Sequence, residues 1–183
     1  PVNQSEGQLN LLMIANWQVL KRPLIVLEAC RRLIDRSLKV KIRIIGEGLQ
    51  RPEMEILATT QQLVGNVTFL GSLRKDKIAE EMCQADALVH PSSYETFSVV
   101  CAEALCCGTP VIASNLEAIS EYINHSNGML VNNSIDEWCT ALQLFAKNSS
   151  NYDRCEISKN ALKMFSSSVV GFKLKALYKD LWE

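Results

Sequence analysis

The chain has little excess charge, no long apolar run and no low-complexity segment. Its 19 basic and 20 acidic residues leave a net charge of −1, which argues against a surface for nucleic acid. No run approaches the roughly 20 apolar residues that a helix needs to span a bilayer. Residues 1–8 lack the basic and apolar pattern of a signal peptide. We therefore expect a cytoplasmic globular protein that binds no nucleic acid.

Several ligand-binding motifs are also absent. The seven cysteines form no pair of metal-binding knuckles. Neither the Gly-x-Gly-x-x-Gly spacing of dinucleotide-binding loops nor a Walker A lysine motif occurs. We expect most of the cysteines to be buried thiols in a reducing compartment. The adjacent Cys106 and Cys107 are no redox motif, because no residues separate them.

Short apolar runs alternate with helical segments along the 183 residues, a length that suits one domain. The runs show little polar alternation, as expected of strands that are covered on both faces. Strands are predicted over 9–15, 40–45, 67–70, 85–91, 110–114 and 128–131. Helices are predicted over 23–34, 52–63, 75–84, 117–123, 134–146, 152–165 and 169–182, besides the one described next. This order predicts an α/β fold, a doubly wound parallel six-stranded sheet with helices on both faces.

Two carboxylates, Glu95 and Glu103, flank the start of a further helix between the fourth and fifth strands. We expect this helix to begin at Thr96 or Phe97 and to stop at Gly108. Glu103 would then lie about 12 Å along the helix axis from Glu95, which lies on the preceding loop. This spacing favours two contacts with one extended ligand over an acid pair that shares a proton.

A phosphorylated ligand suits this end of the sheet, because ligands of doubly wound sheets bind beyond the carboxyl ends of the strands. The start of the helix before Glu103 offers unpaired N–H groups and a positive dipole end. Lys21 and Arg22 follow the first strand and supply positive charge. Gly46 and Gly48 follow the second strand, but a Gly-x-Gly by itself is more often only a turn.

The motifs at these strand ends resemble those of the group 1 (family 4) glycosyltransferases. The resemblance rests on Gly46-Glu-Gly48, on 67–71 and above all on 90–114, in which Glu95 and Glu103 form a Glu-x7-Glu element. Glu121 and Asn127-Gly128 continue it. The family has the GT-B architecture, in which two Rossmann-like domains hold a nucleotide-sugar between them. The resemblance implies that residues 1–183 are the C-terminal, donor-binding domain and that the N-terminal acceptor domain is absent from this chain.

The resemblance also implies roles for individual residues. Glu103 would bind the ribose hydroxyls, Glu95 the transferred sugar, and Lys21 the diphosphate leaving group. The remaining implied donor contacts are the segment Thr96, Phe97, Ser98 and Val99 near the sugar and diphosphate, and Gly46, Gly48, Leu73 and Arg74 near the base. No Asp-x-Asp-type cluster occurs, so neither a metal nor another cofactor is implied.

Two positions depart from the family pattern. Asn16 stands where the family has a phosphate-binding arginine, a charge for which Arg22 is the candidate substitute. Ser98 stands where the family favours glycine, and its side chain is expected to crowd the sugar. His90 is interpreted as a hydrogen-bonded structural residue in preference to a catalytic base. For Glu121, contact with the ligand and a place on a helix face are equally favoured.

The function predicted from the resemblance is retaining transfer of a sugar from a UDP-, GDP- or ADP-sugar to a glycan or lipid acceptor. The acceptor would bind through the missing domain, so the isolated chain is expected to be inactive. A nucleotide-sugar epimerase of GT-B type and a non-catalytic nucleotide-binding module remain open. The amphipathic segment 172–182 is expected to cover the sheet or the missing domain, with peripheral contact with a membrane as the alternative.

Overall fold

The computed structural model describes residues 7–60 and 63–180. Six parallel strands form one sheet in the order β3-β2-β1-β4-β5-β6. The strands are β1 (Gln8–Ile14), β2 (Lys39–Ile45), β3 (Val67–Gly71), β4 (Ala87–His90), β5 (Val111–Ser114) and β6 (Gly128–Val131). The predicted doubly wound parallel sheet is therefore confirmed.

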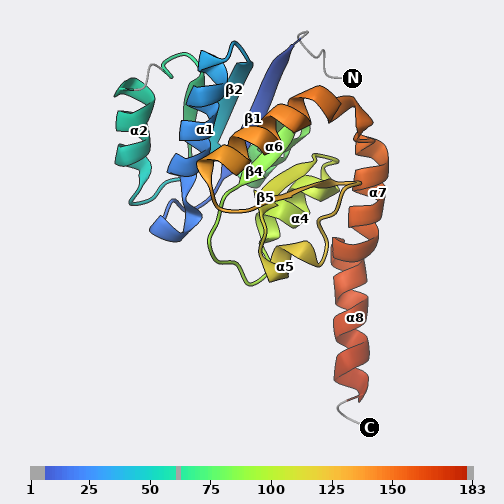
Figure 1. Ribbon diagram of the computed structural model, residues 1–183. Coiled ribbons are helices and arrows are strands. Elements are labelled where there is room, and N and C mark those ends of the chain that lie inside the picture. Colours follow the sequence, from blue (N-terminus) through green and yellow to red (C-terminus); the bar gives the residue numbers. More distant parts are fainter. Residues whose placement is uncertain (1–6, 61–62, 181–183) are drawn as a thin grey trace.

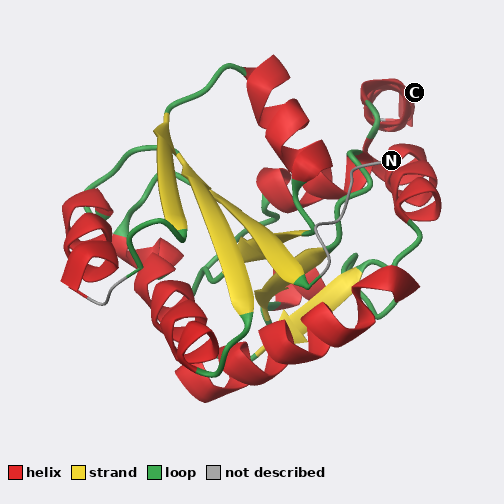
Figure 2. Ribbon diagram, turned by 90° about the horizontal axis from the view of Figure 1, so that it is seen from above, coloured by secondary structure: helices red, strands yellow, loops and turns green. Residues whose placement is uncertain are grey.

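Helices surround the sheet on both faces (Figure 1, Figure 2). They are α1 (Pro23–Asp35), α2 (Arg51–Thr60), α3 (Lys75–Gln84), α4 (Val99–Cys106), α5 (Glu117–Ser120), α6 (Ile135–Asn148), α7 (Arg154–Phe165) and α8 (Ser167–Asp180). Two short 3-10 helices, η1 (Val19–Lys21) and η2 (Ser149–Asn151), lie in the connections. Ser134 caps the start of α6, since its side chain accepts a hydrogen bond from the Glu137 amide.

The central strands β4 and β5 are buried at every residue because each face of the sheet packs on its own layer of helices. In β1, Leu11 and Met13 belong to the cluster with α1, α2 and α6, whereas Leu12 belongs to the cluster with α3, α4, α5 and α7. All three side chains are fully buried. The lack of alternation in the sequence therefore reflects burial on both faces.

The order of the strands reverses between β1 and β4, which are neighbours in the sheet. Leu11 pairs with Ala87 and Leu12 pairs with Leu88. The strands between them in sequence, β2 and β3, lie on the other side of β1. The loops that leave β1 and β4 consequently start side by side at the carboxyl edge. This reversal is the position at which doubly wound sheets bind ligands.

Helix α4 begins later than predicted. It starts at Val99 because Ser98 has the left-handed backbone conformation, with φ 65°, which a right-handed helix does not accommodate. The segment 95–98 is not helical, so the expected two-turn helical spacing between Glu95 and Glu103 is wrong. The predicted stop at Gly108 is confirmed, since α4 ends at Cys106 and Gly108 has φ 75°.

The C-terminal helix also differs from its prediction. Helix α8 extends from the end of α7 away from the sheet, and its side chains are almost all exposed (Figure 1). The expectation that this segment covers the sheet is wrong, because α8 leaves α7 in a direction that takes it off the domain. Residues 181–183, and with them Trp182, lie outside the described residues, as do residues 61–62 of the predicted second helix.

The cysteines are less buried than predicted. Cys30, Cys101 and Cys139 are buried on inward helix faces, but Cys83 and Cys155 are exposed. Cys106 and Cys107 are partly exposed. These four thiols lie at helix ends and outer helix faces, where an apolar sequence neighbourhood does not ensure burial.

Candidate functional site

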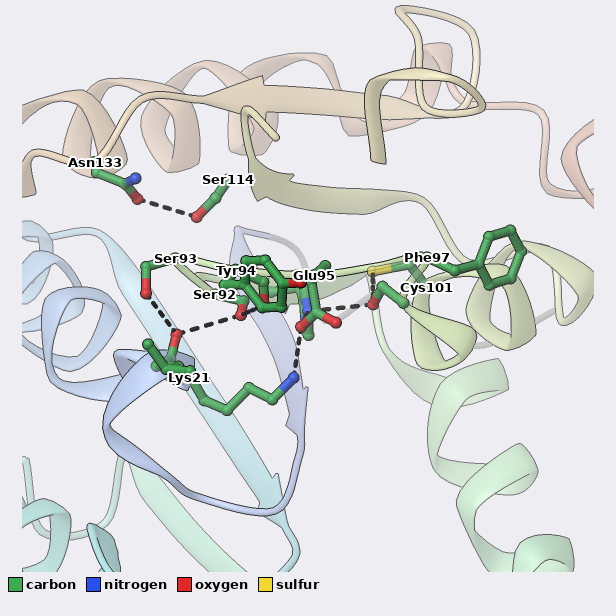
Figure 3. A network of polar contacts seen from close by, with 12 residues as sticks. Lys21, Ser92, Ser93, Tyr94, Glu95, Phe97, Cys101, Ser114 and Asn133 are labelled. Carbon is green, nitrogen blue, oxygen red and sulfur yellow. Dashed lines mark hydrogen bonds and ion pairs between the residues drawn. The ribbon is translucent and has the colours of Figure 1, made fainter. Parts of the chain in front are cut away.

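An ion pair joins the two loops at the reversal of the sheet. Lys21, at the end of η1, places its Nζ 2.5 Å from Oε1 of Glu95, which lies in the loop after β4 (Figure 3). His90, the last residue of β4, brings its Nε2 to 2.7 Å from the same oxygen. The Glu95 side chain is only 10% exposed. The sequence-predicted Lys21 and Glu95 are thus in direct contact.

The environment of Glu95 keeps its carboxyl ionised. Burial raises its pKa, but hydrogen bonds from His90 and Lys21 and the charge of His90 outweigh burial and lower the pKa to about 2. A carboxyl with this pKa holds no proton near neutral pH. Glu95 is therefore suited to accept hydrogen bonds and to balance positive charge, and is unsuited to donate a proton.

The two loops are also joined through backbone groups. The Ser93 amide donates to the Leu20 carbonyl oxygen at 2.7 Å, and the Ser93 and Ser92 hydroxyls lie 3.1 and 3.2 Å from that oxygen (Figure 3). The Ser92 hydroxyl also lies 2.8 Å from the Tyr94 carbonyl oxygen. These contacts fix η1 against the loop that bears Glu95, so the ion pair is held in place from both sides.

The start of α4 is held by buried polar groups. The Ser98 hydroxyl lies 3.2 Å from Nε2 of His90 and 3.2 Å from the sulfur of Cys101. The Tyr122 hydroxyl lies 2.5 Å from the Phe97 carbonyl oxygen and 3.2 Å from that of Ser98. The Ser98 side chain, expected to crowd the sugar, is directed into the protein and is 7% exposed. The positive φ at Ser98 explains why glycine suits this position.

Glu103 lies in a different environment from Glu95. It is exposed on α4 and lines a groove of about 440 Å³ between α3 and α4. The groove is mainly apolar, with Ile78 and Met82 on one wall and Val99 and Ala102 on the other. Within the described chain, the Glu103 side chain makes no hydrogen bond or ion pair. The two acids of the Glu-x7-Glu element therefore meet different surroundings.

Gly46 and Gly48 are required by the packing of two loops. A Cβ atom on Gly48 would lie 2.5 Å from the Trp17 nitrogen, and one on Gly46 would collide with the Ala15 carbonyl group. The Trp17 amide donates to the Glu47 carbonyl oxygen at 2.8 Å. The buried Trp17 thus occupies the space on one side of the Gly-x-Gly turn, which gives both glycines a structural reason.

The remaining predicted residues spread over the same edge of the sheet. Asn16 is exposed and accepts a hydrogen bond from Gln18 at 3.2 Å. The Arg22 guanidinium donates to the Asn133 carbonyl oxygen at 3.3 Å, beyond the end of β6, instead of joining Lys21 and Glu95. Leu73 packs partly buried against the core, and Arg74 is 88% exposed and paired with Asp76. Thr96, Phe97 and Val99 are exposed beside Glu95 and the groove.

Part of this network of contacts around Glu95 and Ser98 was predicted from the sequence, and part was not. His90 is hydrogen-bonded, as interpreted, but its partners Glu95 and Ser98 were not foreseen. Ser92 follows a strand end and could have been suspected from that place alone. Tyr122 gives no local signal, because it lies 24 residues from Ser98 and reaches it only through the fold. Among the described residues, no three His, Cys, Asp or Glu side chains gather into a possible metal site.

The chain is similar in sequence to known glycosyltransferases. The family model described as "Glycosyl transferases group 1" matches residues 2–164. The D-inositol 3-phosphate glycosyltransferase of Rhodococcus jostii is 36% identical over 139 residues, which are 71% of this chain and 31% of that protein. The N-acetyl-alpha-D-glucosaminyl L-malate synthase of Bacillus anthracis is 28% identical over 67% of this chain and 32% of its own length. The chain thus spans about a third of the length of these relatives.

Solved structures share the fold at lower identity. Anabaena HepE in complex with UDP and glucose superposes with a TM-score of 0.82 at 19% identity, over 95% of this chain and 49% of that chain. The pneumococcal O-GlcNAc transferase GtfA, in complex with UDP and GlcNAc, gives a TM-score of 0.82 at 16% identity, over 98% of this chain and 37% of that chain.

Proposed function

Because the chain belongs to the group 1 glycosyltransferases, we propose that it is the donor-binding half of a retaining enzyme that transfers a sugar from a nucleotide-sugar. The observation that supports this most is the Lys21–Glu95–His90 network at the reversal of the sheet, directly beside the start of α4. It combines a cation, a fixed carboxylate and a helix N-terminus where a doubly wound sheet binds its ligand.

In this proposal the diphosphate binds between Lys21 and the start of α4. Sugar transfer releases a nucleoside diphosphate, so negative charge develops on the leaving group. The Lys21 ammonium and the N–H groups at the start of α4 stabilise that charge, because both are held in position before the donor arrives. No metal ion is needed for this role. When the donor binds, its diphosphate competes with Glu95 for the Lys21 ammonium.

Glu95 positions the transferred sugar. Its carboxylate remains ionised near neutral pH, since its pKa is about 2, and it has acceptor capacity beyond the oxygen that meets Lys21 and His90. Sugar hydroxyls donate to such a group, so Glu95 orients the sugar and leaves proton transfer to other groups. The nucleophile for a retaining reaction is then the acceptor hydroxyl, which the missing half of the protein would supply.

The groove between α3 and α4 takes the nucleoside. Its apolar walls suit the flat face of a base, and Glu103 at its edge suits the two vicinal ribose hydroxyls, which one carboxylate accepts together. Gly46, Gly48, Leu73 and Arg74 belong to the loops proposed to border the base. A uracil base is the first candidate, because the solved neighbours named above contain UDP.

Calorimetric titration with UDP, GDP and ADP tests this proposal. We expect one nucleotide, UDP first, to bind the isolated chain, and the corresponding nucleotide-sugar to bind at the same stoichiometry. The chain by itself should transfer little sugar, because the acceptor half lies outside it. If none of the three nucleotides binds to the folded protein, the donor-binding proposal is wrong.

A non-catalytic nucleotide-binding module is the second candidate function. It is favoured by Asn16, which puts a neutral side chain where the family has arginine, and by the engagement of Arg22 with Asn133. Restoring the charge with Asn16→Arg distinguishes the two. A module that no longer catalyses transfer would bind UDP, yet the whole protein would not transfer sugar with either residue at position 16.

A further inference from the structure

Two cysteines lie at the ends of neighbouring helices beside the groove described above, which Cys107 lines. Cys83 lies in the last turn of α3 and Cys107 directly follows α4, and an interaction with the Cys83 thiol is one of the causes that raise the pKa of Cys107. Cys83 is exposed, whereas Cys107 is partly exposed. Neither residue belongs to the network around Glu95.

The backbones of both residues are held together by neighbouring contacts. The Thr109 hydroxyl, two residues after Cys107, donates to the Met82 carbonyl oxygen at 2.5 Å. The Arg154 guanidinium donates to the Cys83 carbonyl oxygen at 2.9 Å and to the Thr109 hydroxyl at 3.0 Å. The end of α3 and the end of α4 are thus fixed to one another by a buried threonine and by an arginine from α7.

We propose that Cys83 and Cys107 are an oxidation site at which hydrogen peroxide or a related oxidant forms a reversible disulfide between α3 and α4. A disulfide requires two Cβ atoms near 4 Å apart, and the contacts of Thr109 and Arg154 hold the ends of α3 and α4 beside each other. The disulfide would narrow the part of the α3–α4 groove that Met82 and Cys107 line.

The two thiols have different roles in this reaction. Burial is the largest cause that raises the pKa of Cys107, to about 11, so this thiol is protonated near neutral pH. Cys83 is exposed and is therefore the thiol that the peroxide reaches first; its sulfur gives up a proton to solvent and attacks one peroxide oxygen, which forms a sulfenic acid with release of hydroxide. The Cys107 sulfur then loses its proton and attacks the Cys83 sulfur. The overall change converts two thiols and one hydrogen peroxide into one disulfide and two waters.

Two other cysteines provide matched controls. Cys106 is adjacent to Cys107 and lines the same groove, and Cys155 lies with Cys107 along an open surface on the α7 side. Either could replace Cys83 or Cys107 if oxidation were governed by exposure alone. Our proposal excludes both, because the α3–α4 contact joins Cys83 and Cys107 specifically.

Peptide mapping of the oxidised chain tests the pairing. Cleavage after glutamate places Cys83 in residues 82–95 and both Cys106 and Cys107 in residues 104–117. After peroxide treatment we expect these two peptides to be joined, with the loss of two hydrogen masses, and to separate again after dithiothreitol. The link should persist in Cys106→Ala and Cys155→Ala and should be lost in Cys83→Ala and Cys107→Ala.

Several results would overturn the proposal. They are a link that survives in Cys107→Ala, a link from 104–117 to the peptide 138–156 that contains the exposed Cys155 and the buried Cys139, or no link in a protein that circular dichroism shows to be folded. The unfolding temperature provides a second readout. A disulfide between positions that already suit it should raise the midpoint by about 5–10 °C in the parent chain and not in Cys83→Ala. A link without any rise would show that the helices must distort to form it, which contradicts a prearranged pair.

Discussion

The two carboxylates of the Glu-x7-Glu element occupy contrasting parts of the molecule. Glu95 is almost buried, and its Oε1 contacts both Lys21 and His90. Glu103 stands exposed on α4 at the edge of an apolar groove, where no described side chain forms a hydrogen bond with it. The first acid is fixed by the protein before any ligand binds, and the second is available to the ligand.

Identical residues in one motif therefore need not make the same energetic contribution. Substitution of Glu95 changes the folded protein as well as the site, because it leaves Lys21 and His90 without their shared acceptor. Substitution of Glu103 should change ligand binding alone. Substitutions at the two acids and at their neighbours separate these roles.

The largest effect is expected for Lys21→Met, which removes the cation proposed to meet the diphosphate. A hydrogen bond to a charged group contributes about 1.5–3 kcal/mol, so the affinity for UDP should fall by roughly 10- to 100-fold. The affinity for uridine, which has no phosphate, should change little. Calorimetry with both ligands measures the difference. Lys77→Met, at an exposed lysine paired with Glu80, is the control and should bind UDP normally.

Glu103→Ala should lower the affinity for UDP and the affinity for uridine equally, by about tenfold, because both ligands carry the ribose hydroxyls. Its free energy of unfolding in urea should stay within about 0.5 kcal/mol of that of the parent chain, as is usual for an exposed side chain without partners.

Glu95→Ala should have a smaller effect on the affinity for UDP and a larger effect on the affinity for the nucleotide-sugar. Equal losses of free UDP binding in both variants would contradict the roles proposed for the two acids.

Glu95→Gln should lower stability in a pH-dependent manner. The pKa of Glu95 falls from an ordinary 4.5 to about 2 on folding, so the ionised carboxyl stabilises the fold above pH 4.5 and loses this contribution as the pH falls towards 2. We expect the variant to be less stable by about 1–2 kcal/mol at neutral pH. The difference from the parent chain should shrink in urea titrations at about pH 3. Glu80→Gln, in an exposed pair, should show no such trend.

The smallest effect is expected for Ser98→Gly. Glycine relieves the left-handed backbone strain but loses the contacts of the hydroxyl with His90 and Cys101, and each change is worth about 1 kcal/mol in opposite directions. The midpoint temperature of thermal unfolding should therefore shift by only a few degrees. Ser98→Ala keeps the strain and loses the contacts, so it should be the less stable variant. A stability of Ser98→Ala equal to that of the parent would show that the hydroxyl contributes nothing.

The sequence predicted the fold well, because its strands are short apolar runs, the central ones buried on both faces, and its helices are bounded by glycine, proline and capping residues. The six predicted strands all occur, in the parallel arrangement expected from their alternation with helices. The start of α4 was misplaced because helix propensity at Thr96 and Phe97 gave no indication of the backbone at Ser98. That conformation depends on His90 and Tyr122, which are distant in sequence or belong to other elements.

The candidate site was predictable in its location but not in its contacts. The strand ends and the motif located Lys21, Glu95 and Glu103 at one edge of the sheet. The ion pair between Lys21 and Glu95 spans 74 residues and depends on the reversal of strand order between β1 and β4. The hydrogen bond from Arg22 to the Asn133 carbonyl oxygen likewise spans 111 residues. No local pattern encodes either feature.

The outward course of α8 has a consequence for the cooperativity of unfolding. Phe172, Leu174 and Leu177 are 75%, 49% and 60% exposed, so they add little to the free energy that maintains the sheet. A helix of 14 residues that lacks such packing is marginally stable by itself in water. Its amide protons should therefore exchange with solvent through local opening, many times faster than those of β4 and β5, whose exchange requires the whole domain to unfold. The chain consequently has two levels of stability, and the boundary between them lies at Ser166, where α7 gives way to α8.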